Sequence, residues 1–211
     1  DITHEMVQYV LPQLVGVAKM EDESIRLKAT ELLSKLLLLE NTDVSSLFPE
    51  LFNVGFVGRL HDVSPNVRLA AVQQTSAILV AKPLLAPDLV KALEERALDS
   101  NEKVREALVH AACTGAQEDL TLCAPLISLV APRMGDKKPG VRKAARDGLC
   151  ALYKAHSIAH LTEYTEARTV PEELHCIPKM LMHCYGVDEK KDVEKKAEPV
   201  AEGAPGPSSA G

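Results

Sequence analysis

A short sequence pattern recurs four times along the chain, and each copy contains Ile or Val followed directly by Arg. The copies are EDESIRLKA (21–29), DVSPNVRLAA (62–71), DSNEKVREAL (99–108) and DKKPGVRKAA (136–145). Successive arginines lie 42, 37 and 37 residues apart. A period of about 40 residues with two helices per unit is typical of stacked helical hairpins. The repeat therefore predicts a stack of similar helical units.

The residues that follow each Ile or Val have the period of a helix. Positions four, eight and eleven residues further on are mostly apolar or small, and these spacings keep to one helix face. They are Ala29, Leu33 and Leu36; Ala71, Thr75 and Ile78; Leu108, Ala112 and Gly115; and Ala145, Leu149 and Leu152. Small residues at the first position allow neighbouring helices to approach closely. Ser64-Pro65 is typical of a helix start, with Ser as the N-cap and Pro at the first helical position.

A more apolar A helix precedes each of these B helices, at about residues 5–17, 47–60, 86–98 and 121–134. Two A helices contain a proline, Pro12 or Pro125, which either kinks the helix or marks a later start. Aromatic residues are only 3% of the chain, which suits thin layers of small and medium side chains. These features predict an all-α fold, a HEAT-repeat superhelical solenoid of about four helical hairpins plus a further helix.

The further helix is expected to open at Pro171 and to run to about Tyr185, like the A helix of a fifth repeat. From Asp188 the sequence has almost no large apolar residues and is rich in Pro, Gly, Ala, Glu and Lys. Such a segment cannot bury enough surface to offset its ordering entropy. We therefore expect a solenoid over 1–187 and a disordered low-complexity tail over 188–211. The absence of an initial Met and of a signal peptide favours a piece of a longer protein.

The last three copies of the pattern have an Asp six residues before the Arg, and the pair predicts a structural ladder along the stack. The Asp falls in the turn between the A and B helices, where a carboxylate accepts backbone N–H bonds at a helix start. The Arg, one turn into the B helix, can reach an Asp of its own or of an adjacent repeat. The predicted ladder consists of Asp62, Arg68, Asp99, Arg105, Asp136 and Arg142. In the first copy, Glu21 and Asp22 lie near the expected place. Such a ladder would fix the rotation between layers.

Charge is distributed unevenly in this chain of net charge -6. Residues 1–52 have a net charge of -5, whereas residues 133–154 have a net charge of +5. The basic stretch contains a candidate patch for phosphate groups or an acidic partner, formed by Arg133, Lys137, Lys138, Lys143 and Arg146. The alternative interpretation is a solvated polar face. No aromatic residues alternate with these cations, so base stacking is not expected. A weak direct contact with DNA or inositol phosphate is a subsidiary prediction.

No arrangement typical of an enzyme is found in the sequence. The chain has no glycine-rich phosphate loop, no nucleophile elbow and no pair of carboxylates in an apolar pocket. His156 and His160 fit a solvated helix end better than a metal site. His175-Cys176 and His183-Cys184 are about 12 Å apart along a helix, which is too far for one zinc ion. We therefore expect no catalytic residues, no metal and no cofactor.

The five cysteines are odd in number and form no CxxC pattern. They are expected to be small buried hydrophobic residues in a reducing compartment. No apolar run approaches the roughly 20 residues that a membrane span needs. We therefore expect no membrane association.

Several longer segments resemble one known family. They are VLPQL (10–14), IRLKATELLSKL (25–36), FVGRLHDVSPNVRLAAV (56–72), LVKALEERALDSNEKVREALVHAACTGAQEDL (89–120), MGDKKPGVRKAARDGLCALYKAH (134–156) and IPKMLMHCY (177–185). In this order and at these spacings they resemble the Pds (precocious dissociation of sisters) family of cohesin-associated HEAT-repeat proteins. Two features depart from that family: the fourth turn is Lys-Lys-Pro-Gly where the family is more basic and bulky, and the tail after Asp188 has no counterpart.

This resemblance implies a non-enzymatic scaffold that regulates sister-chromatid cohesion in the nucleus, on chromosomes. Proteins of this kind bind the kleisin subunit of the cohesin ring along the solenoid and recruit factors that release or acetylate cohesin. No short motif marks kleisin-contacting residues, so none is assigned in this chain. The alternative hypothesis, from another functional class, is a generic HEAT or armadillo adaptor for nuclear transport or phosphatase assembly.

Overall fold

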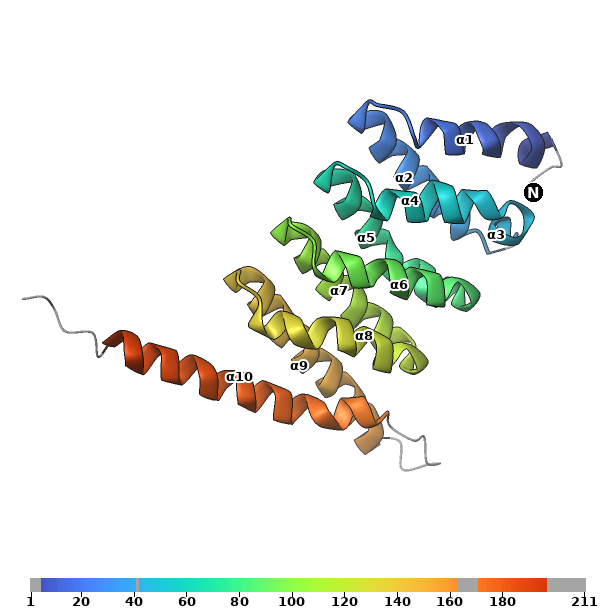
Figure 1. Ribbon diagram of the computed structural model, residues 1–211. Coiled ribbons are helices and arrows are strands. Elements are labelled where there is room, and N and C mark those ends of the chain that lie inside the picture. Colours follow the sequence, from blue (N-terminus) through green and yellow to red (C-terminus); the bar gives the residue numbers. More distant parts are fainter. Residues whose placement is uncertain (1–4, 41, 163–170, 197–211) are drawn as a thin grey trace, which may run out of the picture. The chain divides into compact units, whose positions relative to one another are not determined.

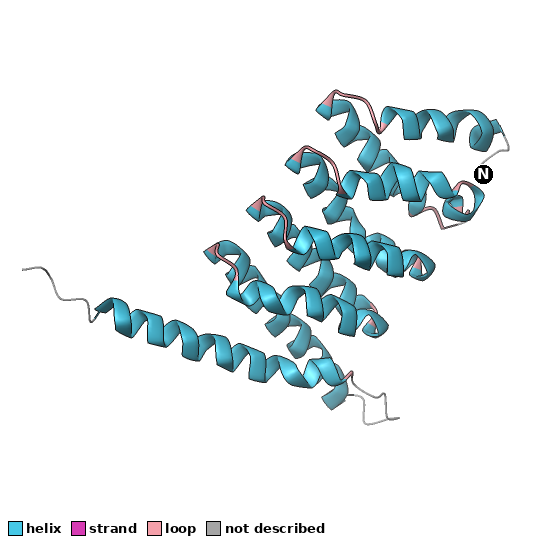
Figure 2. Ribbon diagram, in the orientation of Figure 1, coloured by secondary structure: helices cyan, strands magenta, loops and turns pink. Residues whose placement is uncertain are grey.

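The computed structural model describes residues 5–40, 42–162 and 171–196. The chain divides into two units, Asp1–Ile177 and Pro178–Gly211. Within the described ranges all regular elements are helices, mostly α-helices with short 3-10 and π segments (Figure 2). The prediction of an all-α fold is confirmed. No helix in these ranges is long and apolar enough to cross a membrane.

The first unit contains four helical hairpins, each made of an A helix and a B helix (Figure 1). The A helices are η1 with α1 (Met6–Val10, Leu11–Val17), η2 with α4 (Leu51–Phe56, Val57–Leu60), α6 (Ala86–Ala97), and α8 with η5 (Cys123–Val130, Ala131–Gly135). The B helices are α2 (Glu23–Leu37), α5 (Pro65–Ala81), α7 (Glu102–Glu118) and α9 (Pro139–Thr162). Short segments α3 (Val44–Leu47), η3 (Pro83–Leu85) and η4 (Leu120–Leu122) lead into the later A helices.

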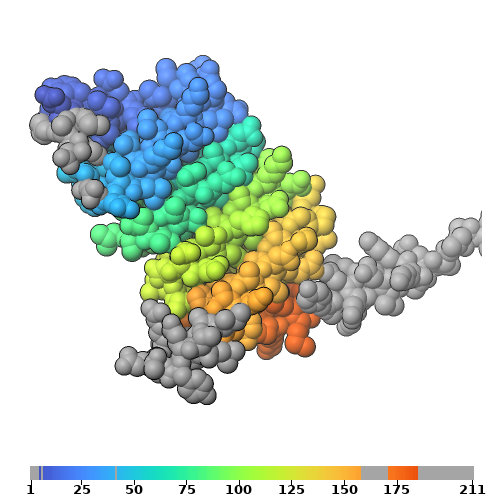
Figure 3. All heavy atoms as spheres, turned by 180° about the vertical axis from the view of Figure 1, so that it is seen from behind, coloured from blue at the N-terminus to red at the C-terminus, as the bar shows by residue number. Residues whose placement is uncertain are grey.

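The core lies between the A and B helices and between successive B helices, with α2 packed on α5, α5 on α7, and α7 on α9. The helix face predicted from the sequence is the buried one. Its small residues Ala29, Ala71 and Ala145 are at most 3% exposed, and Leu33 and Leu149 are fully buried. Each fully buried Leu contributes roughly 1.5–3 kcal/mol. Figure 3 shows the hairpins of this unit as successive bands of colour, so each hairpin packs on its neighbours in sequence.

Polar side chains fix the starts of three B helices. The Asp22 carboxylate accepts a hydrogen bond from the backbone N–H of Ser24 (2.7 Å), and the Ser64 hydroxyl accepts one from Asn66 (3.2 Å). In the third repeat the side-chain oxygen of Asn101 accepts a bond from the N–H of Lys103 (2.9 Å). N-caps of this kind each stabilise a helix by about 1 kcal/mol.

The two prolines of the A helices have different effects. Pro125 lies in the first turn of α8, which begins at Cys123, so its missing N–H breaks no helical bond. The later-start interpretation therefore applies to this helix. Pro12 instead follows η1 within a helical stretch that begins at Glu5. The hydrogen bonding just before the proline, over Met6–Val10, is that of a π-helix, and such segments often occur where a helix is distorted.

Helix α10 spans Glu172–Lys196 and crosses the boundary between the two units at Pro178. Within the first unit its residues Leu174 and Ile177 are buried. The helix ends later than the predicted position near Tyr185, because most of residues 188–196 are Glu and Lys, residue types with good helix propensity. The division into a solenoid over 1–187 and a disordered tail over 188–211 stays a prediction, and residues 197–211 lie outside the described residues.

Candidate binding surface at the turn edge

The turns between A and B helices lie on one edge of the first unit, where Figure 2 shows them as stacked loops. We call residues 18–22, 61–64, 98–101 and 136–138 the turn edge. In the last three turns an Asp carboxylate organises the backbone. Asp62 Oδ1 accepts a bond from the N–H of Ser64 (2.8 Å), Asp99 Oδ1 from Asn101 (2.9 Å), and Asp136 Oδ1 from Lys138 (2.9 Å).

Each of these carboxylates also receives a two-pronged guanidinium from the preceding repeat. The Nε–Oδ2 and Nη2–Oδ1 distances are 2.8 and 3.0 Å for Arg26–Asp62, 2.7 and 2.9 Å for Arg68–Asp99, and 2.8 and 2.8 Å for Arg105–Asp136. Paired bonds of this geometry are among the strongest that charged side chains make. The Arg of one repeat therefore pairs with the carboxylate in the turn of the next repeat, not with the carboxylate of its own Asp.

A third N–H group of each Arg is bound to its own turn. Nη1 donates to the carbonyl oxygen six residues earlier, at 2.9 Å for Arg26, 2.8 Å for Arg68, 2.7 Å for Arg105 and 2.8 Å for Arg142. This bond holds the guanidinium in an orientation that faces the turn of the next repeat. The guanidinium thus joins two successive turns, and this arrangement of Arg and Asp side chains is the Asp–Arg ladder.

Five of the six predicted ladder residues take part in these side-chain pairs: Asp62, Arg68, Asp99, Arg105 and Asp136. Arg142 makes the backbone bond to Asp136 but has no Asp partner among the described residues.

The sequence interpretation missed Arg26, which is the partner of Asp62. In the first turn, the position six residues before Arg26 is Met20, and Asp22 acts as an N-cap instead of a ladder residue.

A second arginine approaches each ladder carboxylate from the end of the A helix, and the sequence interpretation missed this as well. Arg59 Nη1 lies 2.7 Å from Asp62 Oδ2, Arg96 Nη1 lies 3.5 Å from Asp99 Oδ2, and Arg133 Nη1 lies 3.3 Å from Asp136 Oδ2. The signal was present as Arg-x-x-Asp at the end of the last three A helices. Each step of the ladder therefore joins two guanidinium groups to one carboxylate.

Hydrogen bonding keeps the ladder carboxylates ionised. The bonds from Arg105 lower the pKa of Asp136 to about 2, and the N–H of Lys138 acts in the same direction against the opposing effect of burial. Burial is the largest influence on the pKa of Asp62 and of Asp99 and acts to raise it. Their arginine and backbone hydrogen bonds outweigh burial, so both pKa values are lowered.

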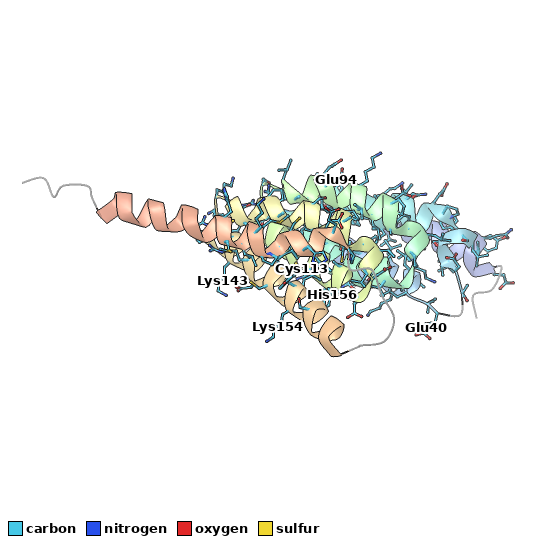
Figure 4. All side chains as sticks on the ribbon, turned by 90° about the horizontal axis from the view of Figure 1, so that it is seen from below. Glu40, Glu94, Cys113, Lys143, Lys154 and His156 are labelled. Atoms are coloured by element: carbon cyan, nitrogen blue, oxygen red, sulfur yellow. The ribbon has the colours of Figure 1, made fainter. Side chains whose placement is uncertain are left out.

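The residues of the predicted basic patch lie in different surroundings. Arg133 belongs to the ladder, and Lys137 lies beside it in the fourth turn. Lys138 is paired with Glu102 of the preceding repeat (Nζ–Oε2, 3.1 Å), and Lys143 is paired with Asp147. Arg146 is half-buried on α9. Figure 4 shows Lys143 projecting on the side opposite to Glu94 of α6.

The residues weighed for metal binding are separated. No group of three or more His, Cys, Asp or Glu side chains suited to a metal ion occurs among the described residues. His156 is half-buried on α9, and the side chain of His160 lies outside the described residues. His175 and Cys176 are exposed on α10. Cys113, Cys123, Cys150 and Cys176 are free thiols.

Stacked hairpins joined by an Asp–Arg ladder define a helical-repeat protein of the HEAT type, a class that presents extended binding surfaces. Within that class, the family model described as "Sister chromatid cohesion protein PDS5 protein" matches residues 1–200, so the chain belongs to the PDS5 family.

Among its relatives are the mouse sister chromatid cohesion protein PDS5 homolog A, 33% identical, and the chicken PDS5 homolog B, 30% identical. Both similarities cover 92% of this chain and 14% of the relative, so the chain spans a small part of their length.

Two solved structures share the fold. One is from the "Structure of the Pds5-Scc1 complex", with a TM-score of 0.72 and 20% identity, covering 87% of this chain and 28% of that one. The other is Cex1p, with a TM-score of 0.53 and 17% identity, covering 90% of this chain and 37% of that one.

Proposed function

We propose that the chain is a non-enzymatic scaffold segment of a sister-chromatid cohesion regulator and that it binds the kleisin subunit of cohesin through its helical-repeat surface. The observation that supports this most strongly is the family match over residues 1–200. It favours the cohesion-regulator hypothesis over a generic transport or phosphatase adaptor. The fold likeness to Pds5 from the Pds5–Scc1 complex agrees with a solenoid that accepts an extended partner.

The place of action that follows from this proposal is the nucleus, on chromosomes. Cohesin release and acetylation factors are proposed as further partners, since a solenoid of this kind offers more than one face to bind.

Binding of the 211-residue chain to overlapping synthetic peptides that tile the cohesin kleisin tests the proposal. We expect saturable binding to one short region and none to scrambled versions of the same peptides. A chain shown to be folded by circular dichroism that binds no kleisin peptide would contradict kleisin recognition by this segment. Co-precipitation of the release factor by the same chain tests the second set of partners.

A weak contact with DNA or inositol phosphate is retained as a subsidiary proposal. The pairing of Lys138 with Glu102 and of Lys143 with Asp147 lowers the positive charge available to phosphate groups. Replacing Lys137, Lys138 and Lys143 together with Glu should abolish retention on DNA or on an inositol phosphate resin without unfolding the protein. Retention that survives these changes would reject this patch as the site.

A further inference from the structure

A cavity of about 300 Å³ lies on the turn edge between the third and fourth turns. Its base is the ladder pair Arg105–Asp136, and its sides include Leu98, Pro132, Arg133 and Lys137. Leu98 is 75% exposed. The cavity therefore combines an apolar wall with cationic groups.

At the equivalent place one repeat earlier, an acidic side chain of the protein lies beside the second arginine. His61 occupies the position of Leu98, and its Nε2 lies 3.0 Å from Glu95 Oε2. Glu95 Oε2 also lies 3.2 Å from Nη2 of Arg96, the second arginine of that ladder step. Nη1 of Arg96 donates to the carbonyl oxygen of Leu60 at 2.6 Å. At this step the positive charge of Arg96 is therefore balanced by the carboxylate of Glu95, a residue of the same chain.

The fourth repeat lacks that carboxylate. Pro132 stands where the third repeat has Glu95, and Leu98 stands where the second turn has His61. Arg105 and Arg133 share the single carboxylate of Asp136, and Lys137 has no ion-pair partner among the described residues. The step between the third and fourth turns therefore has unmatched positive charge beside an exposed leucine.

The geometry points to a peptide-docking site at this cavity for an extended acidic segment of a protein partner. We propose that an Asp or Glu of the partner lies against Arg133 and Lys137, in the place that Glu95 takes beside Arg96, while an apolar neighbour packs on Leu98 and Pro132. Charge complementarity favours this occupant, because the open side of the cavity offers cations and carbon surface but no free carboxylate. The inference rests on the proposed function only in treating the chain as a peptide-binding scaffold.

The test uses a fluorescein-labelled peptide with alternating Leu and Asp residues and the full 211-residue chain, with binding followed by fluorescence polarisation. We expect saturable binding at about 0.1 M salt that weakens at about 1 M, where the Debye length falls from about 10 to 3 Å. Lys137→Glu should weaken binding about tenfold or more. Pro132→Glu should do the same without unfolding the chain, because it places a carboxylate beside Arg133 as Glu95 lies beside Arg96. Lys143→Glu, on the B-helix side and already paired with Asp147, is the matched control and should change affinity less than twofold.

Several results would overturn the proposal. One is unchanged affinity in both Lys137→Glu and Pro132→Glu; another is an equal loss in Lys143→Glu, which would indicate diffuse electrostatic attraction. Equal binding of a peptide with Asn in place of Asp, or with Ser in place of Leu, would exclude the acidic or the apolar half of the recognition. Inositol hexakisphosphate binding without peptide binding would reassign the cavity to phosphate groups. Because the peptide is not a kleisin sequence, failure of this test and failure of kleisin binding are distinguishable.

Discussion

Arg105 donates two parallel hydrogen bonds to Asp136, each 2.8 Å long, although 31 residues separate the two in the chain. Both side chains are 3% exposed. A third bond from Arg105 to the carbonyl oxygen of Asp99 is 2.7 Å long. The guanidinium therefore joins the third turn to the fourth, and the same relationship links the earlier repeats through Arg26 and Arg68.

Removing this guanidinium should destabilise the stack. In Arg105→Ala the Asp136 carboxylate stays buried without its main partner, and loss of one member of a buried ion pair costs roughly 3–5 kcal/mol. Arg105→Lys should also destabilise the protein, because an ammonium group cannot make the two-pronged contact. The measurement is the urea midpoint of unfolding by circular dichroism. Lys103→Ala, exposed on the same helix, is the control and should stay within about 0.5 kcal/mol of the original chain. Equal midpoints for Arg105→Ala and the control would contradict a structural role for the ladder.

Stability should fall in acid because the ladder carboxylates have lowered pKa values in the folded chain. The pKa of Asp136 is about 2 when folded, against about 3.9 for an unfolded Asp. The folded state therefore favours the ionised form, and this contribution is present above the unfolded pKa and is lost as the pH falls toward 2. For Asp136 it amounts to about 2 kcal/mol. Urea unfolding midpoints should decline as the pH is lowered from about 6 to about 2.

Asp136→Asn separates this contribution from that of other carboxylates. The variant should be less stable at neutral pH, and its stability should depend less steeply on pH below about 5. Glu31→Gln, an exposed acidic residue on α2, is the matched control and should leave the pH dependence unchanged. Parallel pH profiles for Asp136→Asn and the original chain would contradict the lowered pKa.

The fold was predictable because its determinants are local and repeated. The positions four, eight and eleven residues after Val67 and Val141 marked the buried face of each B helix before any contact was known. The end of α10 was not predictable in the same way. Its last residues are polar but favour helix, so a rule based on buried surface placed the end too early.

Most residues of the ladder were predictable from the sequence, but which Arg pairs with which Asp was not. The spacing of Asp and Arg cannot say whether the pair forms within one turn or between two turns, because the distance between repeats depends on helix packing. In the structure the pair forms between repeats, which also brings Arg26 into the ladder and leaves Arg142 without an Asp among the described residues. Arg133 was assigned to a surface patch from its charged neighbours in sequence, yet its Nη1 lies 3.3 Å from Asp136 Oδ2.

The close contact of α7 with α9 requires a glycine at position 148. A Cβ added to Gly148 would lie 2.7 Å from Sγ and 3.4 Å from Cβ of Cys113. Gly→Ala within a helix normally stabilises by roughly 0.5–1 kcal/mol. At this position the sulfur or the helix must move, so Gly148→Ala should destabilise by about 1–3 kcal/mol. Thermal and urea unfolding measure the effect.

Two further variants identify the cause of that loss. Cys113→Ala removes the sulfur, so the double variant Gly148→Ala with Cys113→Ala should recover part of the stability lost in Gly148→Ala. Gly58→Ala, in α4 with no atom within 4 Å of the added Cβ, should be neutral or stabilising. Additive effects of the two changes at 113 and 148 would show that the contact does not limit this interface.

The same packing should divide the cysteines by reactivity. Burial raises the pKa of the Cys113 thiol to about 12, and burial is also the main cause that raises the pKa of Cys123 to about 11. Cys150 and Cys176 are exposed. The thiolate is the reacting form. A disulfide reagent at a pH of about 8, well below the raised pKa values of Cys113 and Cys123, should therefore modify Cys150 and Cys176 quickly. Cys123, which is buried, should react only after denaturant unfolds the chain, and the half-buried Cys113 should react far more slowly than the exposed pair. Mass spectrometry of the labelled peptides identifies the sites.

Cys150→Ser should remove part of the fast phase and leave the slow phase intact. Labelling of Cys113 in the folded chain as fast as Cys150 would show that α7 and α9 separate readily, and the tight contact at Gly148 would then not describe the protein in solution.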